Sequence, residues 1–220
     1  MTGDPYAPWW AHTLVVFDVE TTGLDEADRV VELGLARFEA GELVDQWGTL
    51  VYPDMEIPAE ATEIHGISTV DVATAPPFVG ALPDVVRIAR DAYPTAYNAS
   101  FDRRMWVNEL KRTVLTDITL PIFDPAVRWL DPLTWVRKID GIWGKNKLTV
   151  ACERYDVSLQ NAHRATDDAV AAGRLLYTLK ERLPSWTMTE MIRRQAQLHR
   201  KQDDERAAWF RKKGLPYERR

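Results

Sequence analysis

The stretch that decides the fold is HTLVVFDVETTGL, residues 12–24. Residues 12–18 are apolar and β-branched, which is typical of a buried strand. Asp18 and Glu20 come at its end, and side chains two positions apart on a strand project from the same face. Two adjacent acids there lose hydration and repel each other, and a bound divalent cation would offset both costs. A pair of solvated acids at a strand end is the alternative reading.

A second acid-bearing segment is NASFD, residues 98–102. It follows a short expected strand and opens an expected helix, residues 101–113, with Ser100 as the predicted N-cap. Asp102 then lies in the first turn of this helix. The alternative role for Asp102 is that of an acid that interacts favourably with the positive end of the helix dipole.

The third segment is HRATDD, residues 163–168. His163 lies just ahead of an expected helix, and an imidazole, with an ordinary pKa of about 6.5, suits a general base at neutral pH. Ala165 and Ala169 form a small pair four residues apart, which predicts a close approach of this helix to the sheet.

Together the three segments supply four acids and one imidazole. This set can hold two divalent metal ions over a phosphodiester and deprotonate a water molecule beside it. Mg²⁺ and Mn²⁺ prefer oxygen ligands, so one of these is the expected cofactor. The sequence therefore predicts a metal-dependent exonuclease.

The composition of the 220-residue chain suits one large domain, or one domain with an appendage. Its 45% hydrophobic content allows a sizeable core, and it contains no run of about 18 apolar residues that would span a membrane. The N-terminus lacks a secretion pattern. Cys152 is the single cysteine, at amphipathic helical spacing, and is expected to be a buried, inert thiol. All of this fits a cytoplasmic protein.

The net charge of −5 is unevenly distributed. Residues 184–220 contain ten Lys and Arg against five Asp and Glu, so the first 183 residues carry a net charge of −10. Part of the acidic excess belongs to the expected metal cluster. The basic tail is a candidate for phosphate attraction.

Hydrophobic patterning predicts five strands, at residues 12–18, 29–39, 42–52, 95–98 and 127–130. It predicts helices at residues 78–92, 101–113, 148–155 and 164–182. Residues 53–77 read as irregular. A meander of strands followed by alternating helices and strands indicates an α/β fold, with a mixed five-stranded sheet flanked by helices. Residues 1–183 are expected to form this domain, and residues 184–220 a charged helical extension.

The FDVETTGL, YNASFD and HRATDDA segments resemble the three exonuclease motifs of the DnaQ-like family. That family includes the proofreading epsilon subunit of bacterial replicative polymerases and ribonuclease T, and the histidine indicates its DEDDh subgroup. The resemblance runs from about residue 13 to residue 180. It implies a ribonuclease H-like fold and the removal of nucleotides from 3′ ends with two divalent metal ions.

By this resemblance the metal ligands and the general base are Asp18, Glu20, Asp102, Asp168 and His163. One ion would bind the attacking water and the other would steady the leaving oxygen. The family spacing leaves four residues between the histidine and the last aspartate, which selects Asp168. The neighbouring Asp167 is then expected to be a solvent-facing acid near a helix N-terminus.

The resemblance also implies contacts to the 3′ nucleotide, through Thr21, Thr22, Gly23, Leu24, His65, Asn98 and Phe101. Gly23 permits close backbone approach, and Leu24 would lie against the base. For His65 the alternative is a plain loop residue, and for Phe101 it is a core residue. Tyr97 stands where epsilon subunits have a histidine, so substrate contacts there are expected to differ.

Two features outside the motifs bear on nucleic acid. The segment 139–147 combines Trp143 with two lysines, which suits stacking on single-stranded nucleic acid, although a surface loop with one packed tryptophan explains it equally well. In the tail, the tryptophans and methionines are expected to pack onto the domain and the basic residues to form a solvated face.

The sequence favours a 3′→5′ exonuclease acting on DNA with a free 3′ end. Nothing in it reads the 2′-hydroxyl, so an RNA-directed member of the family is an alternative. A non-catalytic module that binds nucleic acid or a polymerase is another, although its acids would repel each other without purpose. A DNA polymerase is a candidate partner, but no polymerase-binding motif is visible, so a free-standing enzyme and a proofreading subunit both stay open.

Overall fold

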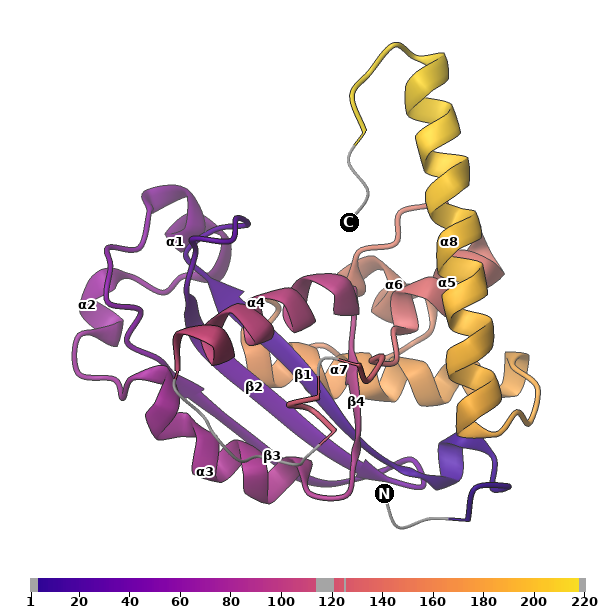
Figure 1. Ribbon diagram of the computed structural model, residues 1–220, viewed down its shortest axis with the longest axis horizontal. Coiled ribbons are helices and arrows are strands. Elements are labelled where there is room, and N and C mark those ends of the chain that lie inside the picture. Colours follow the sequence, from indigo (N-terminus) through magenta and orange to yellow (C-terminus); the bar gives the residue numbers. More distant parts are fainter. Residues whose placement is uncertain (1–3, 114–120, 125, 218–220) are drawn as a thin grey trace.

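The computed structural model describes residues 4–113, 121–124 and 126–217, and a single sheet lies at its centre (Figure 1). Within the described residues this sheet has four strands, β1 (Thr13–Thr21), β2 (Val30–Glu39), β3 (Glu42–Leu50) and β4 (Tyr93–Ala96). Their order is β3-β2-β1-β4. Strand β2 is antiparallel to both of its neighbours, β1 and β3, and β4 is parallel to β1. The predicted mixed α/β fold is confirmed.

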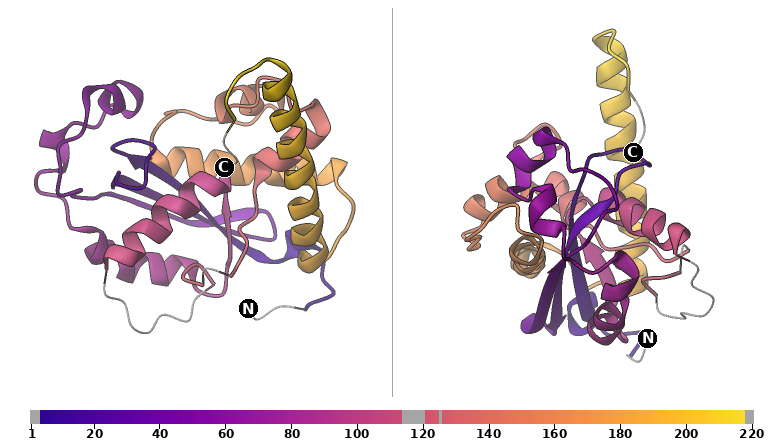
Figure 2. Two further views of the ribbon diagram at one scale, coloured as in Figure 1. Left: turned by 45° about the horizontal axis from the view of Figure 1, so that its top comes forward. Right: turned by 90° about the vertical axis from the view of Figure 1, so that its left-hand side faces the viewer.

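Helices cover both faces of the sheet. On one face lie α3 (Phe78–Ala89) and α4 (Ala99–Arg112), and on the other lies α7 (Ala165–Thr178), as Figure 2 shows. The remaining helices are α1 (Ala59–His65), α2 (Thr69–Val72), α5 (Pro132–Asp140), α6 (Leu148–Arg154) and α8 (Met188–Lys212). Two 3₁₀ turns are η1 (Trp9–Ala11) and η2 (Leu179–Arg182).

Alternate residues of β1 supply two separate cores. Leu14 and Val16 pack on the α7 side, whereas Val15, Phe17 and Val19 pack on the side of α3 and α4. This alternation follows from the period of two along a strand. Both faces of β1 are therefore covered, which explains why residues 12–18 are almost uninterruptedly apolar.

Helix α7 lies unusually close to the sheet because small residues face it. A Cβ on Gly34 would lie 2.0 Å from the carbonyl carbon of Ala165, and a Cβ on Gly173 would lie 2.2 Å from the ring of Phe38. The close approach predicted from Ala165 and Ala169 is confirmed, since both residues are fully buried. On the same side Cys152 is buried, as predicted, and burial raises the pKa of its thiol to about 11.

The fifth strand predicted at residues 127–130 is wrong. Leu130 makes only a single parallel bridge to β4. Pairing stops there because the next N–H that would face β4 belongs to residue 132, and Pro132 has no N–H to donate. The N–H of Asp131 faces the other way and donates to Oε1 of Gln195 at 2.9 Å. Instead of ending a strand, Pro132 begins helix α5 with Asp131 as its N-cap, and this helix was missed by sequence reasoning.

Two other helix starts differ from the prediction. Residues 53–77 contain α1 and α2 and are not irregular throughout. Helix α4 starts at Ala99, and its N-cap is Asn98, with a left-handed φ of 67°, in place of Ser100. The left-handed region is one that Asn tolerates better than most residues, and it lets the chain turn sharply from β4 into α4.

The tail is helical, as predicted. Helix α8 begins with a capping box formed by Thr187 and Glu190, and Met188 and Met191 are buried in the core on the α7 side. Farther along, Nε2 of Gln202 donates to the carbonyl of Thr134 at 2.9 Å. The C-terminal half of α8 extends beyond the rest of the molecule (Figure 1).

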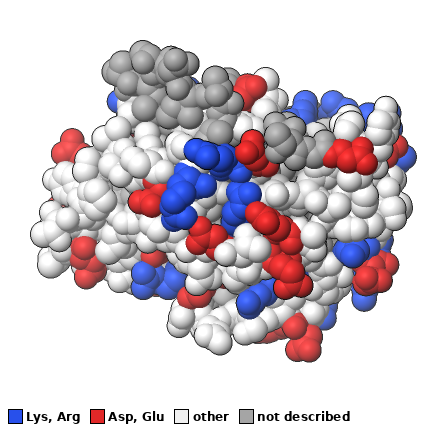
Figure 3. Space-filling model, turned by 90° about the horizontal axis from the view of Figure 1, so that it is seen from below, with Lys and Arg blue, Asp and Glu red and all other residues white. Residues whose placement is uncertain are grey.

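Charges of both signs lie side by side on the face seen in Figure 3. Surface ion pairs of the described residues include Arg37–Glu39 and Arg87–Asp45, and ion pairs at the surface contribute little to stability. None of the helices in the described part of the chain is both long enough and apolar enough to cross a membrane.

Candidate active site

Asp18 and Glu20 lie near the end of β1, on the face that α7 covers. They continue the alternation of Leu14 and Val16, so both carboxylates project from the same side of the sheet. Glu20 is paired in register with Glu32 on β2. The sheet thus brings acidic side chains of two neighbouring strands to one place.

Asp102 approaches β1 from the first turn of α4. Strand β4 ends at Ala96, opposite Phe17, so the N–H of Val19 lies beyond the end of the ladder. This N–H donates to Oδ1 of Asp102 at 3.2 Å. Asp102 is buried, and its carboxylate lies against the backbone between Asp18 and Glu20.

His163 and Asp168 come from the N-terminal end of α7. The backbone N–H of His163 donates to Oδ2 of Asp168 at 3.3 Å, and His163 has a left-handed φ of 67°. Oδ1 of Asp168 is buried without a hydrogen-bond partner among the described residues. A non-glycine residue in this conformation is uncommon, and here it carries the imidazole back over the carboxylate.

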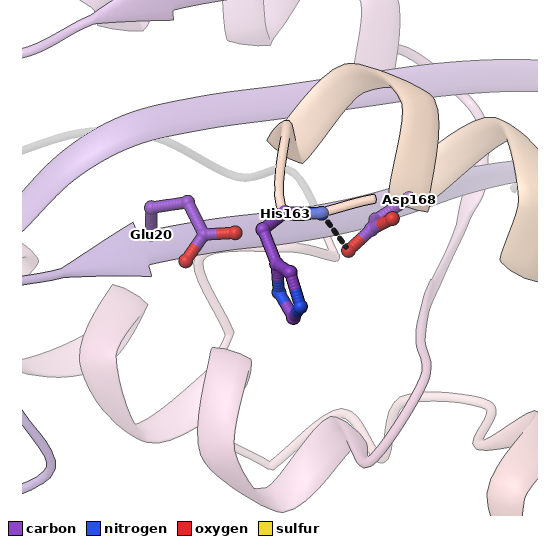
Figure 4. Close-up of side chains that lie close together, drawn as sticks. All are labelled: Glu20, His163 and Asp168. Atoms are coloured by element: carbon purple, nitrogen blue, oxygen red, sulfur yellow. Dashed lines mark hydrogen bonds between the residues drawn. The ribbon is translucent and has the colours of Figure 1, made fainter. Parts of the chain in front are cut away.

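The structure brings three of the predicted residues into direct proximity. Potential ligand atoms of Glu20, His163 and Asp168 all lie within 4.8 Å of one another. Figure 4 shows the imidazole of His163 between the carboxylates of Glu20 and Asp168. Asp18 and Asp102 are close enough to this group to affect its ionisation.

The carboxylates of this cluster hold their protons strongly. Burial raises the pKa of Asp18 well above its ordinary value, with further increases from Asp102 and Asp168. Burial and then Asp168 raise the pKa of Glu20 to about 8, and burial raises that of Asp102 to about 8. For Asp168 burial raises the pKa to about 6. Among the described residues the cluster has no ion pair to Lys or Arg, and a divalent cation stabilises carboxylates in such an environment.

The two adjacent acids of the third motif face different partners. Asp168 points to Glu20 and His163. Asp167 accepts a hydrogen bond from Nδ2 of Asn161 at 2.8 Å. Successive residues of a helix are rotated by about 100°, so the two carboxylates cannot reach the same ion.

The turn after β1 is held by its own side chains. Oγ1 of Thr21 donates to the carbonyl of Gly23 at 2.6 Å, and Oγ1 of Thr22 donates to Oδ1 of Asp28 at 2.8 Å. A Cβ on Gly23 would lie 2.5 Å from the Asp28 carboxylate, so only glycine fits. Leu24 follows with 62% of its surface exposed.

One arginine links this turn to α4. Nη2 of Arg104 donates to the carbonyl of Leu24 at 2.8 Å, and its guanidinium lies over the ring of Phe101, 5.6 Å from the centroid. Phe101 also packs partly against the core on the side of α3 and α4. Arg104 therefore links the backbone of Leu24 to the ring of Phe101, and solvent reaches both side chains.

His65 and Asn98 occupy different surroundings. His65 is buried at the end of α1, where its Nδ1 accepts from the N–H of Ile67 at 3.1 Å. Burial lowers its pKa and His163 lowers it further, which places His65 near the cluster. Asn98 is exposed, and its backbone N–H donates to Oδ1 of Asp131 at 3.0 Å. His65 is thus no loop residue, and the side chain of Asn98 faces solvent.

Sequence reasoning missed Glu32 and Arg164. The buried Glu32 accepts from Nη2 of Arg164 at 2.7 Å and from the N–H of Ala165 at 3.0 Å, which ties the start of α7 to β2. The pair thereby fixes the segment between His163 and Asp168. The available signal was a lone acid inside the apolar run VVELGLARF.

The chain matches a known protein family. Residues 15–176 match the family described as "Exonuclease". The matched region is more than half of the chain, and it contains the four acids and His163.

Two relatives illustrate the sequence similarity. A PolC-type DNA polymerase III of Clostridium perfringens (strain 13 / Type A) is 32% identical over 163 residues, 74% of this chain. The PolC-type enzyme of Streptococcus pyogenes serotype M2 is 32% identical over 166 residues, 75% of the chain. Each alignment covers 11% of the relative, so the chain spans about a ninth of the length of these proteins.

Solved structures share the fold. Exonuclease X in complex with 5′-overhanging duplex DNA is similar with a TM-score of 0.60 and 23% identity, over 81% of this chain and 99% of that one. The nuclease domain of 3′hExo, a DEDDh family member bound to rAMP, has a TM-score of 0.66 and 15% identity, over 80% and 95%. The solved structures share the fold of this chain, and the family match shows that the chain belongs to the exonuclease family.

Proposed function

We propose that this protein is a 3′→5′ exonuclease that removes nucleoside 5′-monophosphates from DNA, using two divalent metal ions and a histidine base. The observation that carries the proposal is the meeting of Glu20, His163 and Asp168 within 4.8 Å. Three segments far apart in the sequence supply these groups together with Asp18 and Asp102. Nothing in the packing of the core requires such a repulsive arrangement.

The donor set fits divalent cations. Asp18, Glu20, Asp102 and Asp168 offer carboxylate oxygens, which Mg²⁺ and Mn²⁺ prefer, and Oδ1 of Asp168 is buried without a partner among the described residues. These four residues would hold the ions. When bound, the ions would supply positive charge that polarises the phosphodiester and lowers the pKa of water.

The chain's own residues would orient the substrate and move the proton. His163 is exposed and held by the start of α7, so its imidazole would accept the proton of the attacking water. The turn at Gly23 lets the backbone approach the terminal sugar. Leu24 and Phe101, which Arg104 links to each other, would contact the last base with their side chains.

The relatives support the proposed substrate and partner. They are PolC-type DNA polymerase III proteins, which makes DNA the favoured substrate and a DNA polymerase the candidate partner of this chain. Co-purification with a polymerase from the source cell, and correction of a mismatched primer end by the mixture, would test the partner separately from the activity.

The activity is tested with oligonucleotides labelled at the 5′ end. With Mg²⁺ or Mn²⁺ the protein should produce a ladder that shortens from the 3′ end, and EDTA should abolish it. DNA should be degraded before RNA of the same sequence in direct competition. Full activity in EDTA, or products shortened from the 5′ end, would contradict the mechanism, and preferential loss of RNA would favour the RNA-directed alternative.

A further inference from the structure

A cavity of about 370 Å³ lies beside the first turn of α4. Its walls come from α4, from the segment that leads into α5, and from one face of α8. Each of these parts contributes an arginine, and the lining arginines are Arg103, Arg128 and Arg200, with His199 beside them. Cations converging from three elements are the usual form of an anion site.

The floor of this cavity is fixed by hydrogen bonds. Asp131, the one carboxylate among the described lining residues, is buried and accepts from the N–H groups of Asn98 and Leu133 at 3.0 and 2.9 Å. Gln195 of α8 accepts from the N–H of Asp131 and donates to the carbonyl of Trp129, both at 2.9 Å. Helix α8 is therefore held against the floor, and the cavity is preformed.

Two of the arginines at the rim, Arg128 and Arg200, have no acidic partner among the described residues. The carboxylate of Asp131 accepts hydrogen bonds from backbone N–H groups in the floor of the cavity. Arg128 and Arg200 therefore offer positive charge to a ligand, in a chain whose first 183 residues carry a net charge of −10.

The cavity lies one helix away from the catalytic cluster. Ser100 and Arg103 line it from the same side of α4, and Asp102 is rotated from Arg103 by about 100° toward β1. Asp131 also contributes, after burial, to the raised pKa of Asp102, which reflects their proximity. A helix with side chains is about 10–12 Å wide. At about 3.4 Å per nucleotide of a stacked strand, this width corresponds to roughly three nucleotides.

We propose that this cavity binds a backbone phosphate of the nucleic-acid substrate about three nucleotides upstream of the bond that is cleaved. The inference rests on the proposed function, because it assigns the polymer degraded at the active site as the ligand. A free nucleotide or inorganic phosphate carries the same anionic group, so the experiment has to separate the polymer from these small anions.

The kinetic arm compares substrate lengths. For each variant, kcat/KM is measured with Mn²⁺ on a ten-nucleotide DNA and on a dinucleotide, which is too short to reach the cavity. Arg128→Gln and Arg200→Gln should lower the ratio of long to short substrate by about tenfold, because a charge-assisted hydrogen bond is lost. Arg200→Lys keeps the charge and should restore most of the ratio. Arg193→Gln, an exposed position of α8 outside the cavity, should keep the wild-type ratio.

The binding arm does not depend on catalysis. In EDTA, binding of the fluorescent ten-nucleotide DNA is followed by anisotropy over a range of salt concentrations. Each Gln variant should reduce the slope of log Kd against log salt by about one, while Arg193→Gln leaves it unchanged. If the wild type shows this binding but degrades nothing, the proposed function fails and the cavity assignment stands.

Two results would overturn the cavity assignment. One is that both Gln variants, folded as judged by their melting temperature, match Arg193→Gln in length ratio and salt slope. The other is that they leave both quantities unchanged but weaken inhibition by thymidine 5′-monophosphate or inorganic phosphate. That outcome would make the cavity a site for free anions and not for the polymer backbone.

Discussion

The chain buries carboxylates in two contrasting ways. Glu109 is bound by two guanidiniums, with Nε of Arg29 at 2.7 Å and Nη1 of Arg112 at 3.3 Å, and Glu32 is bound by Arg164. The cluster around Glu20 has no ion pair to Lys or Arg among the described residues. Both groups lie within one small domain, so burial alone does not explain the difference.

We interpret the difference as separating carboxylates that serve the fold from carboxylates that we propose bind metal ions. A buried carboxylate with an arginine partner is internally compensated, and removing either partner leaves a buried charge. Without an external cation the ionised cluster is unfavourable, because its carboxylates repel one another. Protonation of the carboxylates relieves part of this repulsion. Local departures from good electrostatics are expected at functional sites. The following predictions test this comparison, from the largest expected effect to the smallest.

The largest effect is expected at Asp168. Asp168→Asn removes ligand charge without changing volume, and it should abolish nearly all turnover. Loss of several kcal/mol of charge stabilisation corresponds to about 10³-fold or more in kcat. The matched control is Asp167→Asn, which should remain active and change stability by about 0.3–1 kcal/mol. Single-turnover kinetics of both variants measure this, and an inactive Asp167→Asn beside an active Asp168→Asn would reverse the assignment.

Replacing His163 should lower the catalytic rate but hardly change the binding of metal ions. His163→Ala should lower kcat by roughly 10²–10⁴-fold, because a general base is lost. The rise in melting temperature on addition of Mn²⁺ should persist, since the four carboxylates are intact. Loss of that rise would mean that His163 is a metal ligand and not a base.

Neutralising an acid should change the free energy of unfolding in opposite directions at the paired and the unpaired carboxylates. Glu109→Gln should lower the free energy of unfolding by about 2–3 kcal/mol, somewhat below the usual cost of a broken buried pair because Arg29 is partly exposed. Glu20→Gln should raise it in EDTA, since repulsion is relieved. Denaturant unfolding of both variants in EDTA measures the two signs, and destabilisation by Glu20→Gln would show that the cluster is compensated.

The smallest effect is a pH dependence of the metal-free protein. An acid whose pKa is raised on folding binds more protons in the native state, so stability is complete below the ordinary pKa and is lost as pH rises to the folded value. For Glu20 this window runs from 4.5 to about 8. The melting temperature in EDTA should therefore fall between about pH 5 and pH 8, and saturating Mg²⁺ should suppress most of the fall. A rise over this range in EDTA would contradict the raised values.

The strands were predictable because their signals are local. The apolar run before Asp18 and the turn at Ala40-Gly41 fix β1 to β3 within a few residues. The fifth strand and α5 were not, because Pro132 reads equally well as a stop or as the first residue of a helix. In the structure the side chain of Asp131 caps α5 by accepting from the N–H of Leu133, and its N–H is bound by Gln195, 64 residues away.

The site was predictable to the level of its motifs. Asp18, Glu20, Asp102, His163 and Asp168 stand in short patterns, and their assembly follows from the sheet and two helix starts. The pairing of Glu32 with Arg164 was not predictable, since it joins residues 132 positions apart. The cationic cavity was hidden for the same reason, because its arginines come from three separated segments.

The central claim is that the unpaired buried carboxylates form the metal site. Calorimetric titration with Mn²⁺ at pH 7, in buffers of different ionisation enthalpy, tests it by counting the protons released on binding. Glu20 and Asp102, each with a pKa of about 8, are largely protonated at pH 7, so binding should release more than one proton. The number should fall as pH rises past 8. Mn²⁺ binding without proton release, or equal binding to Asp168→Asn, would contradict the claim.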